Sequence, residues 1–172
     1  MLSRPHRKRS AQAGFTLIES LIAVVVLGVT ISLTVNAISS VSTYAASARE
    51  GELAAEALDG WVDTLANHEF ADVFADFRGR TFTVDGLRIQ EDDPDGVVGR
   101  ILFPVDPADD AVLREDLDDD TFGLPFDLNL DGSVDGADHS GDYRLLPYRV
   151  LVEWNGPTGN RLLVAEGVLG GW

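Results

Sequence analysis

The sequence predicts an α+β protein in which a long N-terminal helix, transmembrane at first and amphipathic later, packs on an antiparallel β-sheet. Two observations predict this fold class. An unbroken apolar segment near the N-terminus leads into residues whose apolar positions recur at helical spacing, and later in the chain the apolar period shortens to two residues. The chain has 172 residues, enough for one domain with a substantial core.

The apolar segment covers residues 15–38 and contains a single ionisable side chain, Glu19. Its 24 residues are enough to span a bilayer, which takes about 20 residues in a helix. Four basic residues precede it: Arg4, Arg7, Lys8 and Arg9. By the positive-inside rule we expect this end to stay cytoplasmic and the acidic remainder of the chain to face outward.

The segment from Ser39 to about Ala66 predicts an amphipathic continuation of the same helix. Apolar residues recur there at helical spacing between charged ones: Val41, Tyr44, Ala48, Leu58, Trp61 and Leu65. Gly51 and Gly60 are weak points in this helix because glycine disfavours helix interiors.

The remaining apolar patterns predict short strands. Residues 80–90 are β-rich on both sides of Asp85-Gly86, a strong hairpin-turn pair, and predict a hairpin. Residues 97–103 predict a further strand. Residues 144–154 and 161–169 predict two strands that pair antiparallel across the turn-rich sequence at 155–160.

The charge is concentrated in one stretch of the chain. Overall, 13 basic residues face 29 acidic ones, for a net charge of −16, and residues 91–142 hold 17 of the acids against Arg100 and Arg114. An acidic surface repels phosphate, so nucleic acid is excluded as a partner. The chain has no cysteine, so no disulfide and no thiolate metal site exists.

The junction before the apolar segment reads Ala13-Gly14-Phe15-Thr16-Leu17-Ile18-Glu19. This sequence resembles the processing motif of type IV prepilins and type II secretion pseudopilins. The resemblance implies that prepilin peptidase cleaves between Gly14 and Phe15 and that the new amino group of Phe15 is methylated. It further implies that Glu19 of one subunit attracts the Phe15 amine of its neighbour during filament assembly.

The resemblance implies three zones: a leader at 1–14, a transmembrane and assembly helix at 15–38, and a periplasmic or extracellular pilin-like domain at 39–172 with an acidic insertion at 91–142. The precursor would cross the inner membrane once, then join other pilin-like subunits through an inner-membrane assembly machinery. Asn36 stands where many major pilins have proline, and a C-terminal disulfide is impossible. Both departures favour a minor pilin or a pseudopilin, in a type IV pilus or a type II secretion system.

Two other interpretations compete with this one. Glu19 alone is more typical of an acid near the end of a plain membrane anchor, and it is the Gly14-Phe15 junction that favours the assembly role. As a whole, the chain also fits a secreted or membrane-anchored acidic calcium-binding domain with an ordinary signal peptide cleaved near Ala46-Ser47-Ala48. In that case the apolar stretch is long for a signal peptide, and Glu19 has no role.

The acidic stretch contains a pattern typical of calcium loops at residues 127–138. Oxygen-bearing groups fall at loop positions 1, 3, 5, 7, 9 and 12, with Gly132 at the sharp turn. The predicted ligands are Asp127, Asn129, Asp131, the Ser133 carbonyl, Asp135 and Asp138. The pattern resembles the dockerin type of loop, but the following residues do not predict a helix, so we expect an isolated calcium loop. An Asp/Gly-rich turn in so acidic a protein also matches this pattern by chance.

No catalytic constellation is present in the sequence, and we expect no enzyme activity. Asp138-His139-Ser140 contains the three residue types of a hydrolase triad, but sequence neighbours cannot adopt its relay geometry. The three histidines are scattered and have no zinc-ligand spacing.

Overall fold

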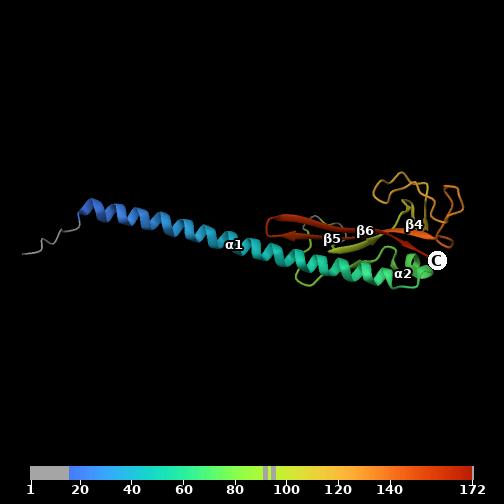
Figure 1. Cartoon of the computed structure of the whole chain (residues 1–172), viewed down its shortest axis with the longest axis horizontal. Coiled ribbons are helices and arrows are strands. Elements are labelled where there is room, and N and C mark those ends of the chain that lie inside the picture. The colour runs from blue at the N-terminus through green and yellow to red at the C-terminus, as the bar shows by residue number, and fades with distance from the viewer. Residues whose placement is uncertain (1–15, 91–92, 94–95, 172) are drawn as a thin grey trace, which may run out of the picture. The chain divides into compact units, whose positions relative to one another are not determined.

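The computed structural model describes residues 16–90, 93 and 96–171. The chain divides into two compact units, residues 1–42 and 43–172. Helix α1, Leu17–Ala66, runs through the end of the first unit into the second, and α2, Phe70–Phe77, follows it (Figure 1). The single long helix expected from the apolar segment and its amphipathic continuation is confirmed.

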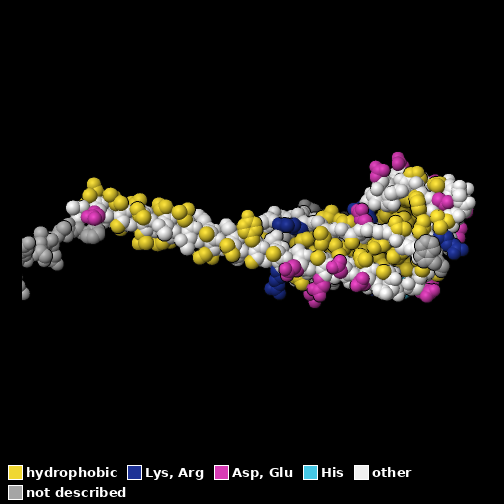
Figure 2. Space-filling model, viewed as in Figure 1, with side chains coloured by type: hydrophobic (Ala, Val, Ile, Leu, Met, Phe, Trp, Pro, Cys, Tyr) yellow, Lys and Arg dark blue, Asp and Glu magenta, His cyan; other side chains and the backbone are white. Residues whose placement is uncertain are grey.

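In the described part of the first unit, the chain forms the apolar part of α1, whose side chains are exposed (Figure 2). The helix begins after Thr16, whose hydroxyl oxygen accepts the backbone N–H of Glu19 at 3.3 Å, as in an N-cap. Inside the helix, the hydroxyls of Thr30 and Thr34 donate to the carbonyls of Val26 and Thr30, both at 2.8 Å. These polar groups are therefore satisfied within the helix, as a lipid environment requires.

The second unit is built on a four-stranded antiparallel sheet in the order β1-β2-β5-β6. Its strands are β1, Thr81–Phe82, β2, Gly99–Leu102, β5, Leu145–Gly156, and β6, Gly159–Gly170. The strands β5 and β6 form a hairpin along their whole length. Three of the predicted strands, at 97–103, 144–154 and 161–169, are confirmed, as is the antiparallel pairing of the last two.

The core lies between one face of this sheet and the part of α1 that belongs to the second unit. Alternate residues of β5 contribute to it, because side chains two apart share one face of a strand. They are Leu146, Tyr148, Val150, Val152 and Trp154. Helix α1 contributes Ala54, Leu58 and Leu65, and α2 contributes Val73, Phe74 and Phe77. The apolar residues that recur at strand spacing and those that recur at helical spacing thus belong to one core.

The predicted hairpin at residues 80–90 is wrong. Only β1 forms a strand there; residues after Phe82 turn at Asp85-Gly86 but do not pair with it. Instead β1 pairs with β2, with Phe82 opposite Gly99. A Cβ on Gly99 would lie 2.1 Å from the Phe82 ring, so the glycine admits this ring. Packing of Phe82 in the core decided the pairing over the local turn preference.

A small second sheet lies inside the acidic stretch, and the sequence did not predict it. It consists of β3, Val105–Asp106, and β4, Asp109–Leu113, paired antiparallel. Its turn is fixed by Asp106, whose carboxylate accepts the N–H of Ala108 at 2.8 Å. Acidic residues are rare in strands, and those in β3 and β4 explain why the sequence shows no strand pattern there.

Candidate functional site

Leu128, in the acidic loop between β4 and β5, has no exposed surface and anchors the loop in the core. Its carbonyl accepts the N–H groups of Arg144 and Leu145 at 2.8 and 2.9 Å, which ties the loop to the start of β5. Its own N–H donates to the Glu115 carboxylate at 2.8 Å. The residues of the predicted calcium loop therefore start from a fixed point in the core.

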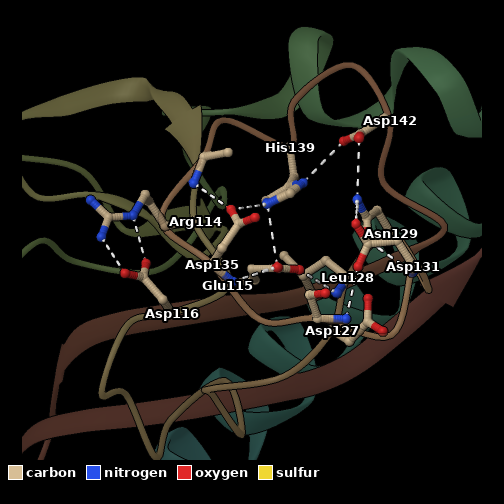
Figure 3. A network of polar contacts seen from close by, with 12 residues as sticks. Arg114, Glu115, Asp116, Asp127, Leu128, Asn129, Asp131, Asp135, His139 and Asp142 are labelled. Atoms are coloured by element: carbon tan, nitrogen blue, oxygen red, sulfur yellow. Dashed lines mark hydrogen bonds and ion pairs between the residues drawn. The ribbon is translucent and has the colours of Figure 1, made fainter.

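Glu115, just after β4, is the most buried carboxylate of the region, with 1% of its surface exposed. One of its oxygens accepts the N–H of Leu128, and the other accepts the N–H of Asp135 at 2.9 Å (Figure 3). A single side chain thus holds both ends of the segment 128–135. Burying a carboxylate is costly unless hydrogen bonds satisfy it, and these two do so.

The first half of the predicted calcium loop has the geometry of a tight acidic turn. Asp127 accepts the N–H of Gly132 through Oδ2 at 2.8 Å, and Gly132 has a φ of +92°, a conformation that favours glycine. Asn129 Oδ1 accepts the N–H of Asp131, and Asp131 Oδ1 accepts that of Ser133, at 3.1 and 2.8 Å. The other oxygen of Asp127, Oδ1, is buried and accepts no hydrogen bond from the described residues.

The second half of the loop distributes its predicted ligands differently. Asp135 is exposed, and its Oδ1 faces His139. Asp138 Oδ1 accepts the N–H groups of Leu113 and Ser140 at 3.2 and 2.9 Å. The structure therefore brings Asp127, Asn129 and Asp131 together around one turn, and it directs Asp138 toward the end of β4.

His139 is the most buried basic side chain of the region, with 4% of its surface exposed. Nδ1 lies 3.1 Å from Asp142 Oδ1, while Nε2 lies 3.4 Å from both Glu115 Oε1 and Asp135 Oδ1 (Figure 3). Burial opposes protonation, but the hydrogen bond to Asp142 and the charge of Glu115 outweigh it and raise the pKa of His139. Three carboxylates therefore surround one imidazole.

The triad residue types at 138–140 do not form a relay. Ser140 Oγ donates to Asp138 Oδ2 at 3.0 Å, and His139 faces Asp142 and Glu115 instead. His139 therefore does not lie between the hydroxyl and the aspartate, as a hydrolase triad requires.

An arginine pairs with two further acids beside this cluster. Arg114 contacts Asp106 through Nη1 at 2.6 Å and Asp116 through Nε at 2.7 Å. The backbone N–H of Ala108 and the Arg114 guanidinium together hold the pKa of Asp106 below its usual range. The hydrogen bond from Arg114 does the same for the pKa of Asp116.

Sequence reasoning missed Glu115, His139 and Asp142 as members of the site. Asp135 and His139 are four residues apart, but this spacing predicts a contact only on a helix, and the segment that holds them is not helical. Glu115 lies 20 residues from Asp135 and carried no spacing signal either. Its role depends on the pairing of β3 with β4, which the sequence did not predict.

At the N-terminus, Gly14 and Phe15 lie outside the described residues. Glu19 lies in the first turn of α1, exposed, and its N–H donates to both the hydroxyl and the carbonyl of Thr16. A carboxylate there is favoured by the positive end of the helix dipole. Among the described helices, α1 is the one long and apolar enough to cross a membrane, with a mean hydropathy of 2.4 over its most apolar window.

A known family matches this N-terminal region. Residues 9–35 match the family described as the prokaryotic N-terminal methylation motif. No curated protein and no solved structure matches the chain significantly. The match is confined to the N-terminal region and supports processing of the prepilin type. Together, the motif and the apolar helix indicate a membrane-anchored precursor of the pilin-like kind.

Proposed function

We propose that this protein is a structural, non-enzymatic subunit of a type IV pilus or a type II secretion pseudopilus, and a minor pilin or pseudopilin within it. The observation that carries the proposal is the methylation motif at residues 9–35, continued by the exposed apolar part of α1. Prepilin peptidase cleaves between Gly14 and Phe15, and methylates Phe15. Other pilin-like subunits and an inner-membrane assembly machinery are the partners.

Electrostatics explains why cleavage and Glu19 belong together. A carboxylate in an apolar segment is costly without a partner, because both lipid and packed helices solvate charge poorly. Cleavage before Phe15 creates an ammonium group four residues away along the chain. Glu19 of one subunit binds the Phe15 ammonium of the next, which sets the axial register of the filament. The basic leader leaves first because it holds the N-terminus at the cytoplasmic face.

The charge distribution favours a sparse position in the filament. With 17 acids between residues 91 and 142, identical neighbours would repel one another across short distances. A component used once or a few times, such as a tip subunit, avoids this repulsion. For this reason we place the protein among the minor subunits and not in the main shaft.

Co-expression with and without prepilin peptidase tests the processing step. The full chain should shorten by the 14-residue leader only when the peptidase is present. Replacing Gly14 with a bulky residue, as in Gly14→Leu, should block the shift, while Gly28→Leu in the same apolar region should leave it unchanged. Cleavage without the peptidase, or near Ala46-Ser47-Ala48, would support the secreted calcium-binding domain instead.

Glu19 has a test of its own that separates assembly from processing. Glu19→Gln keeps the side-chain shape and removes the charge that binds the neighbouring amine. Processing should continue at Gly14, but co-purification with other pilin-like subunits should fall strongly. Unchanged co-purification would show that Glu19 is an acid at a helix end without an assembly role.

We also propose that the loop at residues 127–138 binds calcium. The residues fit the ion, because Asp127 holds the glycine turn with one oxygen and leaves its buried Oδ1 without a hydrogen-bond donor among the described residues. Asn129, Asp131, Asp135, Asp138 and the Ser133 carbonyl complete the predicted set of hard oxygen ligands. Asp138 already accepts three hydrogen bonds, one from Leu113 at the end of β4 and two from Ser140, so it contributes mainly by fixing the loop to β4.

Calcium has a structural purpose in this chain. The loop closes a long acidic connection that no disulfide can hold, since the chain has no cysteine. An ion bound only by the folded loop stabilises that fold by mass action and reduces repulsion among the acids. Extracellular calcium sites work with dissociation constants of roughly 10⁻⁴–10⁻³ M, which suits an outward-facing domain.

A further inference from the structure

We propose a second metal site, for Zn²⁺ or a similar divalent transition metal, formed by Glu115 Oε1, Asp135 Oδ1 and His139 Nε2. One ligand atom from each residue lies within 4.8 Å of the others. The site differs from the proposed calcium loop at residues 127–138 by its nitrogen ligand, and Asp135 is the one residue common to both. Neither the pilin-like function nor calcium binding depends on it.

The first support is the unsatisfied nitrogen of His139. The side chain is 95% buried, yet Nε2 makes no hydrogen bond to the described residues. Buried ring nitrogens almost always have a partner. Here the atom points at two carboxylate oxygens, each 3.4 Å away, as Figure 3 shows. A cation stabilises such a group of electron-rich atoms around one point.

The second support is the tautomer that Asp142 imposes. Its carboxylate accepts a hydrogen bond from His139 Nδ1 at 3.1 Å, so the proton of the neutral ring sits on Nδ1. The lone pair of Nε2 then points toward Glu115 and Asp135. Metal-binding histidines typically have this arrangement, in which a carboxylate orients the ring from its far side. Asp142 is therefore a positioning residue, not a ligand.

The third support is the spacing of the ligand atoms. Zinc bonds of about 2.0–2.2 Å to nitrogen and oxygen place neighbouring ligands of a tetrahedron roughly 3.3–3.6 Å apart. The two 3.4 Å separations agree with these edges. A proton on Nε2 fits less well, because charge-assisted N–H···O bonds are about 2.7–2.9 Å long. Three protein ligands leave a fourth position for water.

Such a site would fasten the acidic loop to the small sheet. Glu115 follows β4, whereas Asp135 and His139 belong to the loop that leads to β5. Both oxygens of Glu115 already accept backbone N–H groups, and each oxygen has a second lone pair for a metal. The metal would therefore add a cross-link to a ligand that is already held rigidly.

Titration of the full chain in detergent micelles, freed of metals, tests the site with Co²⁺ as a coloured probe and Zn²⁺ as competitor. We expect one Co²⁺ per chain with the visible absorption of tetrahedral coordination, and its loss as Zn²⁺ is added. His139→Gln and Asp135→Asn should each weaken Zn²⁺ binding at least tenfold, and Asp142→Asn about tenfold as a positioning residue. Asp131→Asn, in the proposed calcium loop, is the matched control and should bind Zn²⁺ unchanged.

The outcome separates this site from its alternatives. If His139→Gln does not fold, Asp135→Asn decides, because Asp135 is exposed and its loss should leave the fold intact. Equal Zn²⁺ affinity in the wild type and Asp135→Asn, or absence of saturable binding, would overturn the site. So would imidazole NMR signals of His139 that respond to pH but not to Zn²⁺, because they would show a proton as the sole cation there.

Discussion

Glu115 Oε1 accepts the backbone N–H of Asp135 at 2.9 Å, and through this bond a buried carboxylate after β4 positions a loop 20 residues further along the chain. The other oxygen of Glu115 holds the N–H of Leu128. The buried carboxylate of Glu115 thus fixes the backbone of the acidic loop at two positions. The candidate metal ligands are consequently presented by a braced backbone and not by a free loop.

Glu115→Gln tests this bracing. The amide has one acceptor oxygen where the carboxylate has two, so one of the two backbone N–H groups loses its partner in a buried place. We expect a loss of about 1–3 kcal/mol in the free energy of unfolding. Thermal unfolding of the full chain in detergent, followed by near-ultraviolet circular dichroism, measures it. Asp118→Asn, an exposed acid of the same stretch, is the control and should change little.

Leu128 gives a second test of the same loop. The residue is fully buried, so Leu128→Ala removes packing and leaves a cavity, with an expected cost of about 2–5 kcal/mol. Leu130, two residues on, is 56% exposed, and Leu130→Ala should cost less than about 0.5 kcal/mol. Equal effects of the two substitutions on the unfolding midpoint would contradict the anchoring role of Leu128.

Local patterns in the sequence predicted the long helix and the β5–β6 hairpin, because each depends on a continuous period of apolar residues. They failed where pairing depends on distant packing. Strand β1 pairs with β2 because the ring of Phe82 fits against Gly99. The local preference of Asp85-Gly86 for a hairpin does not determine the pairing. Tertiary packing overrides β-turn preference in such cases.

The two candidate metal sites also differ in whether their residues are close together in the sequence. The pattern of the proposed calcium loop could be read from the sequence because its oxygen-bearing residues recur within 12 positions; calcium binding itself stays a prediction. The cluster of Glu115 with His139 could not be read in this way, because β4 and the loop come together only in three dimensions.

Asp106 predicts a specific pH dependence of stability. Hydrogen bonds from Ala108 and Arg114 lower its pKa in the folded protein. A lowered folded pKa stabilises the fold fully above the unfolded value of about 4, and this stabilisation is lost as the pH falls through the folded pKa. Asp106→Asn should therefore destabilise the protein at neutral pH, and its difference from the wild type should shrink below about pH 4.

The matched control for this prediction is Asp109→Asn in the same hairpin. Asp109 accepts the N–H of Ala111 at 3.0 Å in the way that Asp106 accepts that of Ala108, but it lies outside the Arg114 pairs. Unfolding midpoints measured from pH 3 to pH 7 should separate the two variants only at the upper end. A constant difference between Asp106→Asn and wild type across this range would contradict the ion-pair explanation.

Calcium should raise the thermal midpoint of the full chain. At about 1 mM, the ion is close to or above the dissociation constant of typical extracellular sites, so a measurable upward shift is expected. Asp127→Ala should abolish the shift because it removes both the turn bond and the buried oxygen. Asp118→Asn, which also removes one acid, should retain it. Identical midpoints in calcium, magnesium and metal-free buffer would contradict the calcium site.

The central claim is that the chain is a processed, pilin-like subunit, and the mass of its mature N-terminal peptide tests it most directly. Protein isolated from the membranes of cells that produce its assembly system should begin at Phe15 and carry one additional methyl group on the amine. Glu19 would then be the fifth residue of the mature chain. A protein that begins at Met1, or in the region of Ala46 to Arg49, would contradict the account.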